Sequence, residues 1–318
     1  MKIKIGTRGS KLALYQAELV QAHLRKYAGL AEVEIVIIKT SGDMGRQNNP
    51  VPLETKRMFT KEIEDALLSK DIDLAVHSAK DLAARLPAGL MIGAVLERED
   101  ARDCFIQPDK KKLAEMKPGA VIGTSALRRQ TQLLRHHPSM KIVNMRGNVD
   151  TRIKKVLNRE CDGILLAYAG VKRLGLTEHV SEVFEENFIF PAPGQGVIVV
   201  ECRSDDSETK KILQAIHHDS GGKFLAAERA FLLELEGSCQ LPCGIRTHIN
   251  GPRMEASGIL LSPYKTEWIE AELIGQTEQP EELGRELARK ILKQGGQKIL
   301  DEIKGRSADK IHKPGDIK

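Results

Sequence analysis

The sequence begins two long stretches in the same way, and this internal repeat limits the possible folds more than any other feature. KIGTRGSKLAL at residues 4–14 aligns with VIGTSALRRQTQL at residues 121–133. Each copy reads as a short apolar strand, a Gly-Thr step, a polar turn and a helix. Later in each stretch, an apolar strand (DLAV in the first, DGILL in the second) occupies an equivalent place. We therefore predict two lobes of similar α/β design that face a cleft.

Apolar strands in both stretches indicate sheets that helices cover on both faces. The strand segments contain continuous apolar runs rather than alternating apolar and polar residues, a pattern typical of buried parallel strands. Strands are predicted at residues 3–6, 33–40 and 73–78 in the first stretch and at 120–125, 141–146 and 162–170 in the second. Helices are predicted at residues 10–27, with Ser10 as N-cap, and at 60–70 in the first stretch. In the second stretch, one helix follows the strand at 120–125 and runs through about His136, and another begins at Asn148.

Two segments are suited to carry the chain from one lobe to the other and back. LEREDARD at residues 96–103 is charged, and FPAPGQGV at residues 190–197 carries two prolines and two glycines that interrupt regular structure. GVIVVECR at residues 196–203 then reads as a buried strand that returns the chain to the first lobe. Two such crossings would form a hinge between the lobes.

After these stretches the pattern changes to a smaller α+β module of a typical domain size. A helix at residues 220–237 is followed by alternating strands near 246–250, 254–261 and 267–275 and by an amphipathic helix at 280–294. The predicted parts of the chain are lobe 1 (1–96 and 196–216), lobe 2 (101–190), a C-terminal α+β domain (219–306) and a tail (307–318).

The composition is that of an ordinary globular protein and disfavours membrane, secreted and disulfide-rich proteins. Of the 318 residues, 41% are hydrophobic and 29% are charged. No apolar run approaches the roughly 20 residues that a membrane helix needs, and no signal-peptide core follows the first residues, so a cytoplasmic protein is expected. The five cysteines are odd in number and scattered, which predicts reduced thiols rather than a disulfide framework.

Positive charge is concentrated in one segment. Between residues 120 and 176, eleven lysines and arginines stand against three acidic residues, a local net charge of +8 in a chain whose net charge is +5. Such a region predicts an anionic partner, which could be nucleic acid, phosphate or a polycarboxylate. Aromatic residues make up 4% of the chain, so few rings are available to stack on single-stranded bases. The turns contain neither a Walker loop nor a GxGxxG fingerprint, so nucleotide binding has no support.

Charged and hydroxyl side chains follow the predicted strands, where the catalytic groups of α/β proteins gather. Lys80 and Asp81 come directly after an apolar strand. They could bind an anion and move a proton, or they could be a solvated lysine beside a helix-capping aspartate. The turns at residues 7–10 and 124–129 place hydroxyls and arginines at helix N-termini, which favour anions. Two more arginines near a strand end are Arg146 and Arg152.

The segment LEGSCQLPCG at residues 235–244 contains two cysteines four residues apart. The alternatives are half of a metal site, a redox pair, or one reactive thiol beside a core cysteine. No second Cys/His pair at short spacing accompanies them, so no metal site is predicted. Cys239 follows a helix that ends at Gly237 and is bracketed by small and polar residues, which favours an exposed loop thiol. The cysteines predicted to be core residues are Cys104, Cys161, Cys202 and Cys243.

Nine motifs occur in the order found in one enzyme family: TRGSKLAL, KEIEDAL, DLAVHSAKDL, EREDARD, GTSALRRQ, MRGNVDTR, LAYAGVKRLG, PGQG and LEGSCQLP. On these motifs, from residue 3 to about residue 245, the chain resembles hydroxymethylbilane synthase, also called porphobilinogen deaminase. The resemblance implies an α/β fold of two similar doubly wound lobes facing a cleft, like a type II periplasmic binding protein, plus a smaller C-terminal α+β domain. It also implies a transferase of tetrapyrrole and haem biosynthesis. Such an enzyme joins four porphobilinogen molecules head to tail, releases ammonia each time and hydrolyses off the linear product, hydroxymethylbilane.

The resemblance further implies a dipyrromethane cofactor, made from two substrate units and linked by a thioether to Cys239. Asp81 matches the catalytic carboxylate of the family. The positions that match cofactor-binding residues are Ser78, Lys80, Thr124, Arg128 and Arg129. The positions that match substrate-binding residues are Arg8, Ser10, Phe59, Arg146, Arg152, Arg173 and Gln195. The implied partner is porphobilinogen, with no nucleic acid and no membrane, and the implied state is a monomer.

Several positions depart from the family pattern and keep a second function open. Residues 54–59 read ETKRMF where the family has GGKGLF in a mobile loop, and the missing glycines restrict the access of this loop to positive φ. Ala79 and Ala126 replace a methionine and a serine, and LAARLP follows Asp81 where a Val-Pro sequence is preferred. The alternative is therefore a catalytically impaired anion-binding paralogue or sensor on the same two-lobed plan. Nucleic-acid binding through the basic segment is a third reading.

Overall fold

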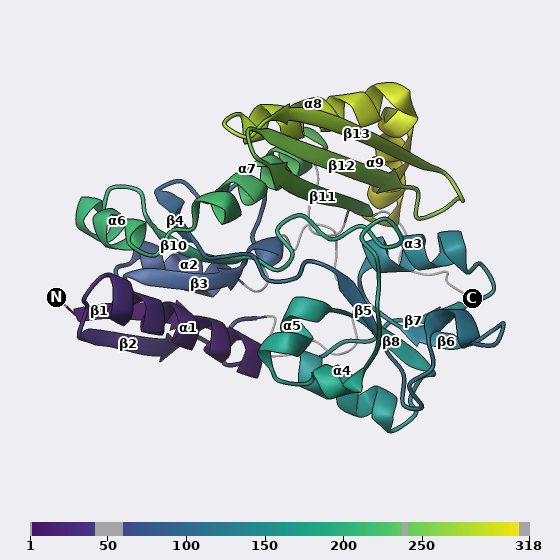
Figure 1. Ribbon diagram of the computed structural model, residues 1–318, viewed down its shortest axis with the longest axis horizontal. Coiled ribbons are helices and arrows are strands. Elements are labelled where there is room, and N and C mark those ends of the chain that lie inside the picture. Colours follow the sequence, from purple (N-terminus) through teal and green to yellow (C-terminus); the bar gives the residue numbers. More distant parts are fainter. Residues whose placement is uncertain (1, 42–59, 237–240, 312–318) are drawn as a thin grey trace.

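The structure is a computed structural model that describes residues 2–41, 60–236 and 241–311, with side chains as far as residue 306 (Figure 1). Within these residues the strands form three sheets, one in each lobe and one in the C-terminal part. None of the helices in the described residues combines the length and the apolar character needed to cross a bilayer.

The sheet of lobe 1 has the strand order β2-β1-β3-β10-β4. Its parallel strands are β1 (Lys2–Thr7), β2 (Glu32–Ile37) and β3 (Leu74–Ser78), and β10 (Ile198–Arg203) runs antiparallel between β3 and β4 (Leu90–Val95). Helices α1 (Lys11–Tyr27) and α6 (Ser207–Gln214) pack on one face, and α2 (Lys61–Leu68) packs on the other. Ser10 is the N-cap of α1 as predicted, because its Oγ accepts from the N–H of Ala13 at 3.3 Å.

The sheet of lobe 2 repeats this plan with the order β7-β6-β8-β5-β9. Its parallel strands are β6 (Val121–Gly123), β7 (Lys141–Val143) and β8 (Gly163–Ala167), and β5 (Asp103–Ile106) runs antiparallel between β8 and β9 (Val180–Val183). Helices α4 (Val149–Leu157) and α5 (Tyr168–Arg173) pack on one face and α3 (Leu127–His136) on the other. The predicted pair of similar lobes is therefore confirmed at the level of strand order.

Both predicted crossings between the lobes are present, and each one supplies the antiparallel strand of the sheet that it enters (Figure 1). The first runs from β4 of lobe 1 to β5 of lobe 2, and the second runs from β9 back to β10. The strands predicted as buried parallel strands are parallel, whereas the direction of the two crossing strands was not predicted. A strand that arrives from the other lobe has no crossover helix on its own sheet to impose a parallel direction.

One predicted strand is too long. Residues 162–170 were expected to be a single strand, but β8 ends at Ala167 and α5 begins at Tyr168. Both parts are buried and apolar, and such a run does not distinguish a strand from a buried helix by its periodicity.

The C-terminal part is a three-stranded antiparallel sheet, β11 (Cys243–Asn250), β12 (Arg253–Leu261) and β13 (Trp268–Gln276), covered by helices (Figure 1). The helices are α7 (Asp219–Glu234), α8 (Pro280–Ile291) and α9 (Gln297–Ile311), the last two joined by a π-helical kink at Leu292–Gly296. Leu283, Leu287 and Ile291 face the core as predicted. Gly284 lets α8 lie directly on α7, since a Cβ there would collide with the carbonyl oxygen of Ala227.

The single tryptophan of the chain lies where lobe 2 meets the C-terminal sheet. The guanidinium carbon of Arg135, from α3, is 4.2 Å from the centroid of the Trp268 ring, and Arg135 Nη1 is 3.6 Å from Glu270 Oε2. A cation over an indole ring stabilises a partly exposed contact by about 0.5–1 kcal/mol.

Removal of this cation is expected to move the tryptophan emission to longer wavelength. Arg135→Gln takes a covering group away from an indole that is already 41% exposed, and steady-state fluorescence checks the shift. Arg306→Gln is the matched control, because Arg306 covers the ring of Tyr264 in the same manner, 4.4 Å from its centroid. Equal emission from Arg135→Gln and the unmodified protein would show that the contact does not form in solution.

Candidate functional site

The predicted site residues of both lobes lie where the parallel strands end. Lys80 and Asp81 belong to a short 3-10 helix, η1 (Ala79–Asp81), that directly follows β3. Thr124 follows β6, and Arg128 and Arg129 occupy the first turn of α3. Because the carboxyl ends of parallel strands open at one edge of each sheet, these groups meet between the lobes.

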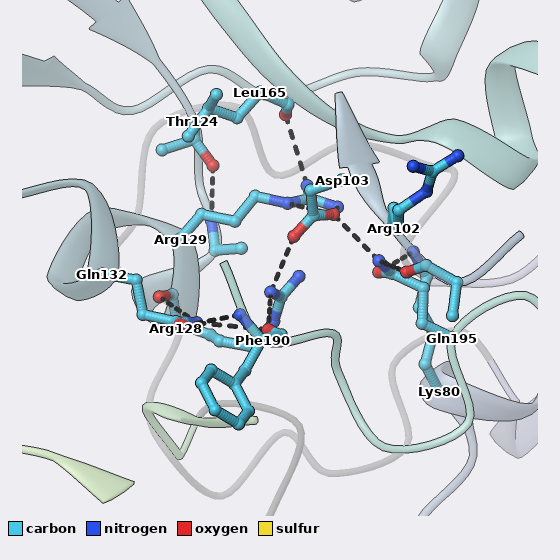
Figure 2. Close-up of polar contacts among 12 residues, drawn as sticks. Lys80, Arg102, Asp103, Thr124, Arg128, Arg129, Gln132, Leu165, Phe190 and Gln195 are labelled. Carbon is cyan, nitrogen blue, oxygen red and sulfur yellow. Dashed lines mark hydrogen bonds and ion pairs between the residues drawn. The ribbon is translucent and has the colours of Figure 1, made fainter. Parts of the chain in front are cut away.

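Asp103, the first residue of β5, is the centre of the polar network at this edge (Figure 2). Its Oδ2 accepts from Arg128 Nη1 at 2.7 Å, and its Oδ1 accepts from Arg129 Nε at 3.1 Å and Nη2 at 2.8 Å. Gln195 Nε2 donates to the same Oδ1 at 2.9 Å. Burial alone would raise the pKa of Asp103, but the two guanidinium groups outweigh it and hold this pKa well below its usual range.

The two arginines at the start of α3 are buried rather than solvated. Arg128 also donates to the carbonyl oxygen of Phe190, and Arg129 Nη1 donates to the carbonyl oxygen of Leu165 at 3.3 Å. Burial lowers the pKa of Arg128, Asp103 opposes this effect and Arg129 adds to it. One carboxylate thus faces two guanidinium groups, so one positive charge of this cluster is not neutralised.

Lys80 brings a third cation to this cluster from lobe 1. Its Nζ donates to Gln195 Oε1 at 3.3 Å. Burial and, next, the charge of Arg129 lower the pKa of Lys80 to about 8, although Asp81 and Asp103 act in the opposite direction. The Lys80 side chain is therefore short of negative partners.

Asp81 and Arg152 approach each other from opposite lobes. Asp81 is exposed at the end of η1, and Arg152 lies one turn into α4, where its Nε donates to the carbonyl oxygen of Gly147 at 2.6 Å. Burial and the charge of Arg129 lower the pKa of Arg152 to about 10, and Asp81 is the group that raises it. The two lobes therefore contribute to a single electrostatic site.

Arg173 and Gln195 lie beside the second crossing. Arg173 Nη2 donates to the carbonyl oxygen of Gly196 at 2.7 Å, and burial lowers the pKa of Arg173. Gln195 is 1% exposed, and its side chain bonds to Lys80, Ala101 and Asp103. In this conformation its contacts are with the protein itself.

The predicted hydroxyl groups are hydrogen-bonded within the protein. Ser78 Oγ accepts from Gln16 Nε2 at 2.8 Å, and Thr124 Oγ1 accepts from the N–H of Ala126 at 3.3 Å. The Thr124 bond and the Ser10 cap shape the turns that precede α3 and α1, whereas the Ser78 bond joins the end of β3 to α1. The two remaining predicted arginines belong to different lobes: Arg8 is half-buried between β1 and α1, and Arg146 is exposed after β7.

Two predicted residues, Phe59 and Cys239, lie outside the described residues, as does the segment 54–59. The other four cysteines, Cys104, Cys161, Cys202 and Cys243, are all buried, as predicted. Burial raises the pKa of Cys243 to about 12, which keeps this thiol protonated and unreactive. Among the described residues, no group of three or more His, Cys, Asp or Glu side chains could hold a metal ion.

The family assignment follows from comparison with known sequences. The family described as porphobilinogen deaminase, dipyromethane cofactor binding domain, matches residues 3–211, and the C-terminal domain of porphobilinogen deaminase matches residues 224–293. The chain belongs to the porphobilinogen deaminase family. The family resemblance and the predicted transferase activity of tetrapyrrole biosynthesis are thereby confirmed.

Relatives in this family match over almost their whole length. Porphobilinogen deaminase of Syntrophomonas wolfei is 45% identical over 304 residues, which cover 95% of this chain and 99% of the relative. The enzyme of Carboxydothermus hydrogenoformans is 43% identical and that of Thermus thermophilus 42%, each over 95% of this chain and over 97% and 99% of the relative, respectively. Among solved structures, the methionine binding protein MetQ is 16% identical with a TM-score of 0.45, over 71% of this chain and 94% of its own.

Asp103 and Glu228 are two members of the site region that sequence reasoning missed. Glu228, fully buried in α7, accepts from Arg98 Nη1 at 2.6 Å and from the N–H of Gly194 at 2.7 Å. It thereby ties both crossings to the C-terminal domain. Asp103 is the last residue of the motif EREDARD and the first residue of a buried strand. An acidic residue directly before an apolar run was the sequence signal that could have identified it.

Proposed function

We propose that this chain joins porphobilinogen units head to tail, with release of ammonia, and releases the linear hydroxymethylbilane by hydrolysis. The observation that carries the proposal is the set of recessed cations between the lobes. Burial lowers the pKa values of four of them, and nearby carboxylates compensate them incompletely; the four are Lys80, Arg128, Arg152 and Arg173. A polyanionic ligand would supply the missing negative charge.

The chemistry of the family's dipyrromethane cofactor fits these residues. Each pyrrole unit carries an acetate and a propionate, so two units bring four carboxylates to a site with an excess of cations. Arginine and lysine side chains bind carboxylates through charge-assisted hydrogen bonds. When bound, the dipyrromethane supplies the primer to which substrate units are joined. We propose that Lys80, Ser78, Thr124, Arg128 and Arg129 hold it, and that Cys239 anchors it.

The other predicted site residues are proposed to act on the substrate. Asp81 is proposed to stabilise the positive charge that develops on the substrate as ammonia leaves, because a carboxylate placed at a developing cation acts electrostatically. The proposed substrate-binding residues are Arg8, Ser10, Phe59, Arg146, Arg152 and Arg173. The resemblance also implies Gln195, but its side-chain amide is bonded within the protein, so it can contribute to substrate binding only through its neighbours. We further propose that the protein acts as a cytoplasmic monomer. The proposed domains are lobe 1 (1–96 and 196–216), lobe 2 (101–190) and the C-terminal domain (219–306).

The mass of the purified protein tests the covalent anchor. We expect the intact mass to exceed that of the sequence by two pyrrole units, and we expect Cys239→Ser to lose this excess. Cys161→Ser, which changes a buried thiol, is the control that keeps it. Folded protein that lacks the added mass and fails to gain it when given porphobilinogen would contradict the proposal. Binding of porphobilinogen without release of ammonia would instead favour the anion-binding sensor.

A further inference from the structure

The side-chain amide of Gln195 uses both of its donors and its oxygen within the protein (Figure 2). Nε2 donates to the carbonyl oxygen of Ala101 at 2.6 Å and to Asp103 Oδ1 at 2.9 Å, and Oε1 accepts from Lys80 Nζ at 3.3 Å. A glutamine amide has two N–H donors, so neither is left for a bound molecule.

We propose that Asp103 and Gln195 are positioning residues that act on the reaction through Lys80. In this arrangement the Asp103 carboxylate fixes the direction of the Gln195 amide, and the amide oxygen holds the Lys80 ammonium at the site. The kinetic part of this inference rests on the proposed function, whereas the part that concerns the charge of Lys80 does not.

The direction of the amide follows from the polarity of its partners. A carbonyl oxygen and an ionised carboxylate can only accept hydrogen bonds, so the nitrogen of Gln195 must face Ala101 and Asp103. Arg128 and Arg129 keep the carboxylate ionised, so it does not become a donor as the pH changes near neutrality. The amide oxygen is consequently left to face Lys80.

Lys80 depends on this oxygen because its other charged neighbours do not secure its ammonium. Arg128 and Arg129 oppose the positive charge, Asp81 and Asp103 favour it, and burial is the largest influence. A hydrogen bond to the charged form of a group stabilises that form and raises the pKa of a lysine. Loss of the amide oxygen is therefore expected to lower the pKa of Lys80 further and to free the ammonium to turn.

The same bonds connect the two lobes. Gln195 lies in the second crossing, Ala101 in the first, and Asp103 begins β5 of lobe 2, whereas Lys80 follows β3 of lobe 1. A movement of one lobe against the other would therefore displace Lys80 relative to the arginines of α3.

Gln195→Met tests the effect on charge without any measurement of activity. The methionine keeps the length of the side chain and removes its donors and acceptor. The pH dependence of acetylation of Lys80 by trace acetic anhydride, followed by peptide mass spectrometry, gives the pKa of its amine. We expect this pKa to fall by about 1–2 units, the effect of one hydrogen bond to a charged group. Gln107→Met changes another buried glutamine, which contacts Asp109 and Lys111 instead, and should leave the value unchanged.

A double-mutant cycle tests whether the effect on the reaction passes through Lys80. Gln195→Met is expected to slow ammonia release from porphobilinogen about tenfold, and to cause no further loss in a Lys80→Met background. A cost to thermal stability should remain in the Lys80→Met background, since the lost bonds to Ala101 and Asp103 do not involve Lys80.

The outcomes separate this inference from the proposed function. An unchanged pKa of Lys80 in Gln195→Met, or an equal loss of rate in both backgrounds, overturns the positioning role. If the unmodified protein releases no ammonia, the proposed function fails and the acetylation profile alone decides the inference. If Gln195→Met does not fold, Gln195→Asn replaces it, because an amide one methylene shorter does not reach Asp103 and Lys80 together. The same fall in the pKa of Lys80 is then expected, and its absence overturns the inference.

Discussion

Asp81→Asn is expected to lower the rate of ammonia release from porphobilinogen by about 10²–10³-fold, the usual effect of removing one group that stabilises a developing charge. Asp81 is exposed and lies within electrostatic reach of Lys80 and Arg152. The substitution keeps the size of the side chain and removes its negative charge. Because Asp81 is exposed, the midpoint of thermal unfolding should stay the same.

The comparison with Asp205→Asn separates this effect from a change in net charge. Asp205 is also an exposed aspartate of lobe 1, and it lies just after β10. Initial rates at saturating and at limiting porphobilinogen distinguish a loss in the chemical step, which lowers kcat, from a loss in binding, which raises KM. A rate for Asp81→Asn equal to that of Asp205→Asn would remove Asp81 from the reaction.

Local patterns in the sequence predicted the parts of the site that depend on neighbouring residues. The repeat at residues 4–14 and 121–133 predicted both lobes, since strand, turn and helix each have a local signature. Lys80 and Asp81 were found because they follow an apolar strand directly, and the end of such a strand opens into the cleft. Ser10 was identified as a helix cap for a similar reason, because capping involves residues only three positions apart.

The network around Asp103 could not be predicted in this way, since its partners are distant along the chain. Arg128 is 25 residues away and Gln195 is 92 residues away. Arginines at the start of a helix are usually solvated, so burial of Arg128 and Arg129 follows only from the tertiary position of Asp103. The antiparallel direction of β5 and β10 could not be predicted either, because the direction of a strand depends on the connection that leads into it.

Asp103→Asn is expected to destabilise the protein by about 3–5 kcal/mol, the usual cost of removing one partner from a buried ion pair. The amide keeps the volume of the side chain, but it leaves the buried guanidinium groups of Arg128 and Arg129 without an anion. Equilibrium unfolding in urea measures the loss. Asp109→Asn is the control, because Asp109 pairs with Arg159 in the same lobe at 2.6 Å with both side chains largely exposed. This control should not shift the unfolding midpoint measurably, since solvent screens exposed pairs.

The pH dependence of the difference between Asp103→Asn and the unmodified protein identifies its cause. The folded-state pKa of Asp103 lies below its value of about 4 in the unfolded chain, so its ion pairs stabilise the fold fully above that pH. Their contribution is lost as the pH falls from there towards the folded-state pKa. The gap in unfolding free energy should therefore be constant between about pH 5 and pH 6, below the range in which Lys80 titrates, and should shrink in acid, below about pH 4. A gap that closes between pH 5 and pH 6 would require a different titrating group, and the buried carboxylate would then not be the source of the stability.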